Sequence, residues 1–133
     1  MSIAWTESLA LGDPVIDSDH RRMIVLIAAL ESAAGGGICL TETGRALAEL
    51  SALCHEHFAR EEDLQRRVGF PGHEDHALAH AMFLKRLDAV LAHFTDGDDE
   101  IRAGIARTLG DSLATWLLGH IANADMEFKP YMA

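Results

Sequence analysis

The stretch that decides the fold is His57-Phe58-Ala59-Arg60-Glu61, which lies inside a longer segment with helical periodicity. Thr41 is the expected N-cap of this segment, and Gly69-Phe70-Pro71 is expected to break it. Residues four apart lie one above the other on a helix, so His57 and Glu61 share one face. The segment is therefore predicted to be a helix that directs two potential metal ligands to the interior.

The same kind of pair recurs along the chain. His76 and His80 are also four apart, and each lies on a helix-like segment different from that of His57. A bundle of four helices would bring these side chains to one interior point. The sequence thus predicts a binuclear metal site with ligands from four segments: His20, His57, Glu61, His76, His80, His120 and Asp125.

The last two ligands have a different spacing. His120 and Asp125 are five apart, which leaves them about 140° from alignment on an ideal helix. We therefore expect the backbone between Ile121 and Asp125 to widen, bulge or end, so that the carboxylate turns back toward the metals.

The remaining segments predict an all-α fold without any β-like alternation. Gly12 and Pro14 suggest an ordered N-terminal arm over 1–17, with Trp5 as its packing anchor. The first helix is expected from about Asp17, capped by Asp17 or Ser18. Three short loops, at 35–37, 69–71 and 95–97, favour an antiparallel up-down-up-down bundle over 18–128, within a single domain of 1–133.

Composition supports a single globular domain and excludes some partners. The chain has 133 residues, 49% of them apolar, which is ample for one core. With 11 basic and 21 acidic residues, the formal charge of −10 argues against nucleic acid and against an anionic membrane surface as partners. The first residues do not resemble a secretory signal, and no apolar run approaches a bilayer span, so a cytoplasmic location is expected.

This ordered set of ligands resembles the hemerythrin family over nearly the whole chain. The flanking residues match as well: Ile16-Asp17 before His20, Phe58 and Glu62 beside the His57/Glu61 pair, Phe70-Pro71 before His76, and Trp116 before His120. One departure is Asp19, because relatives often carry a neutral amide there. It adds negative charge next to the site.

The resemblance implies two non-haem iron ions joined by an oxo or hydroxo bridge. One ion would be held by His76, His80 and His120, the other by His20 and His57, and both by Glu61 and Asp125. Counting ligands leaves the iron of His20 and His57 with five, so its sixth position would bind O2, or else nitric oxide or a small anion.

Reversible O2 binding for storage, delivery or scavenging is the function that the resemblance implies, and no catalysis is needed for it. Di-iron oxidases of ferritin-like bundles use Glu-x-x-His pairs and more carboxylates, whereas this chain has no Glu-x-x-His. Apolar side chains are expected to line the site and keep water away: Phe58, Trp116, Leu117, Met23 and Ile24.

Two alternatives use the same centre. A sensor of O2, redox state or nitric oxide would need a non-covalent protein partner, whose identity the sequence does not reveal. An enzyme acting on peroxide or nitric oxide is disfavoured, because no acid or base is clearly placed beyond the ligands. His55, His73 and His93 have no role in the metal site: His55 should face outward, and His73 should cap its helix or contact solvent.

Overall fold

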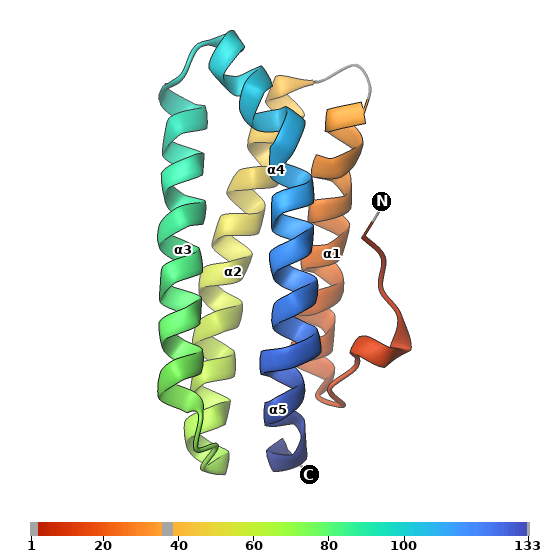
Figure 1. Cartoon of the computed structure of the whole chain (residues 1–133), viewed down its shortest axis with the longest axis vertical. Helices are drawn as coiled ribbons and strands as arrows, with labels where there is room; N and C mark the ends of the chain where they lie inside the picture. The colour runs from red at the N-terminus through yellow and green to blue at the C-terminus, as the bar shows by residue number, and fades with distance from the viewer. Residues whose placement is uncertain (1–2, 36–38, 133) are drawn as a thin grey trace.

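The computed structural model describes residues 3–35 and 39–132, and these form a bundle of four long helices lying side by side (Figure 1). The helices are α1 (Pro14–Gly35), α2 (Leu40–Val68), α3 (His73–Asp96) and α4 (Asp99–Gly119). Successive helices run in opposite directions, and the described residues contain no β-strand. The predicted all-α, up-down-up-down bundle is confirmed.

Helix α1 begins three residues earlier than the expected Asp17. Asp13 Oδ1 accepts hydrogen bonds from the backbone N–H groups of Val15 and Ile16, both at 3.0 Å. Pro14 then occupies the first helical position, where its missing N–H costs nothing. The expected arm over 1–17 is therefore too long, because Pro14 starts a helix here and does not exclude one.

The other helix ends follow local sequence signals with one exception. Gly69 ends α2 in the left-handed conformation, with φ of 73°, and Asp98 caps α4 by accepting a hydrogen bond from Ile101 N–H. The exception is Thr41, which lies inside the first turn of α2 because Cys39 is the N-cap. Gly36 and Gly37 of the expected first loop lie outside the described residues.

The N-terminal arm is tied to α1 along its length. Ile3 is buried, and its N–H donates to the Glu31 carboxylate at 2.7 Å. Asp17 accepts from the N–H of Leu11 at 2.8 Å. Trp5 is partly buried against the core, as expected for a packing anchor. The arm, which precedes α1 in the sequence, therefore covers one side of this helix (Figure 1).

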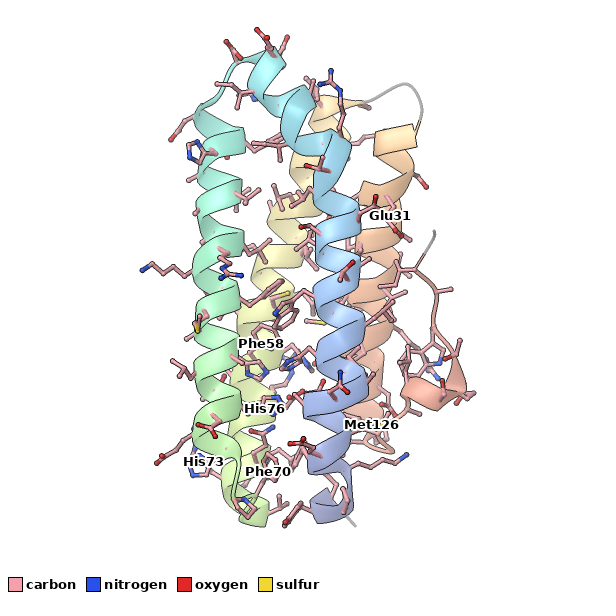
Figure 2. All side chains as sticks on the ribbon, in the orientation of Figure 1. Glu31, Phe58, Phe70, His73, His76 and Met126 are labelled. Carbon is pink, nitrogen blue, oxygen red and sulfur yellow. The ribbon has the colours of Figure 1, made fainter. Side chains whose placement is uncertain are left out.

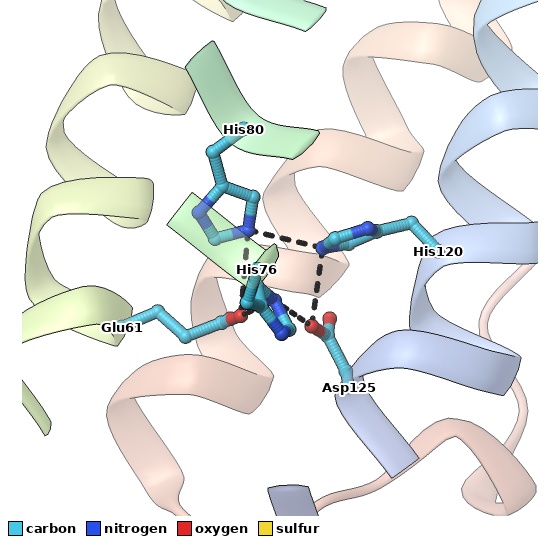
Figure 3. Close-up of side chains that lie close together, drawn as sticks. All are labelled: Glu61, His76, His80, His120 and Asp125. Carbon is cyan, nitrogen blue, oxygen red and sulfur yellow. Dashed lines mark hydrogen bonds and ion pairs between the residues drawn. The ribbon is translucent and has the colours of Figure 1, made fainter. Parts of the chain in front are cut away.

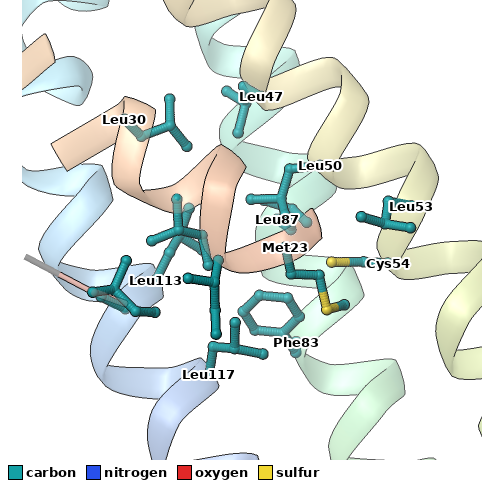
Figure 4. Close-up of a cluster of buried hydrophobic side chains, with 14 of the residues drawn as sticks. Met23, Leu30, Leu47, Leu50, Leu53, Cys54, Phe83, Leu87, Leu113 and Leu117 are labelled. Atoms are coloured by element: carbon teal, nitrogen blue, oxygen red, sulfur yellow. The ribbon is translucent and has the colours of Figure 1, made fainter. Parts of the chain in front are cut away.

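The apolar core lies between the four helices (Figure 4). Burying this surface stabilises the bundle and fixes the rotation of each helix about its axis. The apolar face of α1 is fully buried and consists of Met23, Ile24, Ile27 and Leu30. It belongs to one cluster with buried residues of the other three helices, among them Leu47, Leu50, Leu87, Leu113 and Leu117. No helix in the described part of the chain is both long and apolar enough to cross a membrane.

The close approach of α1 and α4 depends on Gly110. A Cβ atom at this position would lie 2.6 Å from the backbone nitrogen of Glu31. We expect Gly110→Ala to destabilise the protein by about 1 to 3 kcal/mol, because the two backbones must move apart. The matched control is Gly104→Ala on the same helix, where a Cβ meets nothing within 4 Å. It should be neutral or stabilise by up to about 1 kcal/mol. Urea unfolding of both variants measures the difference, and equal effects would contradict this account.

Candidate metal centre

The structure brings all seven predicted ligands together in the interior of the bundle. Each of the seven side chains is at most 8% exposed. They come from four elements that are distant in sequence: His20 from α1, His57 and Glu61 from α2, His76 and His80 from α3, and His120 and Asp125 from the segment after α4.

The segment after α4 is a π-helix, η2 (His120–Asp125). A π-helix has an i→i+5 repeat, so residues five apart come to lie on one face. Asp125 is accordingly fully buried, with Oδ1 3.2 Å from His120 Nε2. The predicted widening between Ile121 and Asp125 is confirmed. A short helix, α5 (Met126–Phe128), and a 3₁₀ turn, η3 (Lys129–Met132), follow it.

Glu61 lies between two groups of histidines, and Figure 3 draws it with the group of His76, His80 and His120. Its Oε1 is 2.7 Å from His76 Nε2 and 3.6 Å from His80 Nε2. Its Oε2 is 3.0 Å from His57 Nε2 and 3.9 Å from His20 Nε2. Each carboxylate oxygen therefore faces a different group.

The two carboxylate oxygens of Asp125 also face different groups of histidines. Oδ1 lies 2.9 Å from His76 Nε2 and on the same side as His120, whereas Oδ2 lies 3.3 Å from His20 Nε2. Within the groups, the Nε2 atoms of His20 and His57 are 3.1 Å apart, and those of His80 and His120 are 3.0 Å apart. The potential donor atoms form two sets, each within 4.8 Å: Glu61, His76, His80, His120 and Asp125; and His20, His57 and Glu61.

The donor set fits metal cations. Within the described chain, the four carboxylate oxygens of Glu61 and Asp125 are buried, and none has a hydrogen bond of acceptable geometry. Leaving buried carboxylates without such partners is costly unless a cation meets them. Imidazole nitrogens and carboxylate oxygens suit iron, manganese and zinc alike. The centre can therefore hold metal, and its donors alone do not choose among these three.

The site also perturbs its own protonation. Burial lowers the pKa of His57, but contacts with Asp19 and Glu61 outweigh it and raise the pKa to about 9. His76 behaves alike: burial is outweighed by Asp125 and Glu61, and its pKa rises to about 9. Burial, together with the charges of His76 and His120, lowers the pKa of His80 to about 2. Without metal, His57 and His76 are therefore positively charged at neutral pH, with both ring nitrogens protonated, whereas His80 is neutral.

Two acidic side chains support the histidines from outside. Asp19 accepts a hydrogen bond from His57 Nδ1 at 2.9 Å, and Glu62 accepts one from His80 Nδ1 at 3.0 Å. In the sequence, Asp19 is the departure from the family pattern that adds charge next to the site, and Glu62 is a residue that flanks the His57/Glu61 pair. Arg60, which holds Asp19, was missed, although its position three after His57 places it near the same face of α2.

Aromatic rings cover the centre on the side of the apolar core. Phe58 stacks on His80 with ring centroids 3.9 Å apart, and Trp116 stacks on His120 at 4.6 Å. Phe83, which the sequence analysis did not single out, stacks on Trp116 at 3.8 Å. The other predicted lining residues, Met23, Ile24 and Leu117, are buried in the adjoining core.

The remaining histidines lie outside the centre. Figure 2 shows His73 at the start of α3, whereas Phe58 and His76 point between the helices. His55 is exposed and contacts Asp88 at 2.8 Å. His93 is also exposed, near the far end of α3.

Comparison with known proteins gives a consistent result. Residues 11–132 match the family model described as "Hemerythrin HHE cation binding domain". The chain is 30% identical to the bacteriohemerythrin of Stenotrophomonas maltophilia over 95% of this chain and 78% of that protein. It is also 30% identical to a bacteriohemerythrin of Pseudomonas aeruginosa, over 92% of this chain and 76% of that protein. A hemerythrin-like protein of Naegleria gruberi is 30% identical over 94% and 89%, respectively.

Proposed function

Because this chain belongs to the hemerythrin family, we propose that it binds O2 reversibly at a pair of non-haem iron ions. The observation that carries the proposal is the division of each carboxylate between the two histidine groups. Glu61 and Asp125 each direct one oxygen toward His76 and the other toward His20 or His57. This arrangement suits two cations that share both carboxylates.

In this proposal, His76, His80 and His120 hold one ion, His20 and His57 hold the other, and Glu61 and Asp125 link them. Two iron ions, bridged by an oxo or hydroxo group, would supply the electrons and the open position that reversible O2 binding requires. The ion held by His20 and His57 would have this position, because that group has one histidine fewer than the other. The chain would thus store, deliver or scavenge O2.

The protein's own residues protect such a centre. Five imidazoles and only two carboxylates keep the site poor in negative charge, unlike the carboxylate-rich sites of di-iron oxidases. Phe58 and Trp116 lie flat against His80 and His120 and exclude water from that side. These features favour binding over catalysis. The cytoplasmic location, the single-domain organisation and the absence of enzymatic activity remain predictions.

Metal binding is expected to release about two protons per chain at pH 7, one from His57 and one from His76, because both have a pKa near 9 in the metal-free protein. The pKa values of His57 and His76 are higher in the folded chain than the ordinary histidine value of 6.5, so their protonation stabilises the metal-free fold. This stabilisation is fully present below pH 6.5 and is lost as the pH rises to about 9. Protons therefore compete with metal most strongly at low pH, and affinity should rise up to about pH 9.

Titration calorimetry with Zn²⁺ in buffers of different ionisation enthalpy counts these protons. The matched control is His55→Asn, which removes a histidine that lies outside the centre. It should release the same number of protons as the original chain. A heat of binding that does not depend on the buffer, over pH 6.5 to 9, would contradict the protonation states given above.

The proposed function is tested by the optical spectrum of the anaerobically reduced protein before and after air is admitted, with iron quantified on the same sample. We expect two irons per chain and a colourless reduced form that gains near-ultraviolet and visible bands. The bands should fade again under vacuum. If they never form, or form once and cannot be reversed, reversible O2 binding is wrong, and the sensor and the enzyme acting on peroxide or nitric oxide become the better hypotheses.

A further inference from the structure

His57 is held on both sides of its ring. Its Nε2 faces Glu61 inside the centre, at 3.0 Å, and its Nδ1 lies 2.9 Å from Asp19 Oδ2. An ionised carboxylate can only accept, so Nδ1 carries the proton and donates it. Asp19 belongs to α1 and is only 6% exposed. The ring is thus fixed between two helices, with one nitrogen directed at the centre and the other away from it.

Asp19 is itself clamped by Arg60 of α2. Arg60 Nη2 lies 2.9 Å from Oδ1 and 2.8 Å from Oδ2, and its Nε lies 3.2 Å from Oδ2. A guanidinium that contacts both oxygens fixes the plane of the carboxylate. The positive guanidinium lies against both oxygens, so it favours the ionised form of Asp19. Asp19 therefore remains an acceptor for His57.

The other half of the centre has a different support. His80 Nδ1 donates to Glu62 Oε2 at 3.0 Å, and Glu62 is partly exposed. In the part of the chain that the structure describes, no lysine or arginine lies within 4.0 Å of this carboxylate. The two halves are therefore supported separately, and only the half of His57 has an arginine clamp.

We propose that Asp19, clamped by Arg60, is a positioning residue that aims His57 Nε2 and thereby sets the metal affinity of the position formed by His20, His57 and Glu61. This inference rests on the two-metal site of the proposed function. A carboxylate on the outer nitrogen fixes the tautomer and orientation of a ligating histidine. Glu62 would do the same for His80, so that each position could be weakened without the other.

Competition between the protein and a chromophoric chelator for Zn²⁺ tests this. The original chain should bind two ions. Asp19→Ala should lower the affinity for one of them about 10- to 100-fold, the usual range for losing an outer support. Glu62→Ala should weaken the other ion, and the double variant both. Arg60→Gln should have a smaller effect than Asp19→Ala, and adding it to Asp19→Ala should cost nothing more, because Arg60 acts through Asp19.

Two controls separate positioning from damage to the fold. Asp19→Asn keeps an acceptor for His57 and should recover most of the affinity. Arg67→Gln removes an arginine of the same helix that pairs with Asp63 outside the centre, and it should change nothing. In the zinc-loaded protein, ¹⁵N resonances of His57 should show a protonated Nδ1, which Asp19→Ala leaves without its partner.

The outcomes distinguish this inference from the proposed function. If the original chain binds fewer than two Zn²⁺ ions, the two-metal site fails and this inference fails with it. If it binds two ions, and Asp19→Ala binds both with unchanged affinity, only the positioning role of Asp19 is overturned. Circular dichroism of each metal-free variant shows that the comparison is made between folded proteins.

Discussion

Removing metal from the loaded protein is expected to lower its melting temperature by roughly 15 °C. In the metal-free protein the carboxylates of Glu61 and Asp125 are buried, and among the described residues their oxygens face only the histidines of the centre. A ligand present at a thousand times its dissociation constant stabilises the folded state by about 4 kcal/mol. In a domain of this size, each kcal/mol shifts the melting temperature by about 4 °C.

The measurement is a pair of thermal unfolding curves at pH 7.5, with Zn²⁺ and with excess chelator. The matched control is the double variant Glu61→Gln/Asp125→Asn, which has nearly the same shape but loses both shared carboxylates. Its two curves should differ by only a few degrees. If chelator changes the melting temperature of the original chain no more than that of the variant, the seven side chains do not act as a metal centre.

The fold and the meeting of the seven side chains could be anticipated from spacing. Residues at i and i+4 share a helix face whatever surrounds them. The pairs His57/Glu61 and His76/His80 therefore predicted that both members of each pair point to the same side of their helix. The five-residue spacing of His120 and Asp125 is incompatible with a regular helix, so it predicted that the backbone would widen, bulge or end there; the structure has a π-helix. A geometric conflict in the sequence was here as informative as a regular pattern.

Contacts between helices could not be anticipated in the same way. The clamp of Asp19 by Arg60 joins residues 41 apart in sequence, and it depends on how α1 and α2 are rotated against each other. Packing across the whole core sets that rotation. Likewise, nothing in the local sequence marks Phe83 as the residue that stacks on Trp116. The predicted start of α1 is wrong for another reason: Gly12 and Pro14 together suggest an arm, whereas Asp13-Pro14 is also a good helix start.

Exchanging Ala124 and Asp125 is expected to weaken metal binding at the centre more than about 100-fold. In η2, residue 125 is buried and lies on the face of His120, whereas residue 124 is partly exposed. The exchange keeps composition and charge but moves the carboxylate away from both histidine groups. Loss of even an outer support costs about 10- to 100-fold in affinity, so loss of a shared ligand should cost more. Zn²⁺ competition titrations measure the effect.

Deleting Asn123 is the informative counterpart, because it should preserve the centre. A π-helical turn contains one residue more than the α-helical turn that it replaces. Without Asn123, which is exposed, the histidine and the aspartate would be four apart and would share a face of an ordinary helix. We expect two Zn²⁺ ions, bound with affinity within about tenfold of the original chain. If the exchange leaves affinity unchanged, Asp125 is not a ligand; if the deletion abolishes binding while the exchange does not, the π-helix matters for a reason other than delivering this carboxylate.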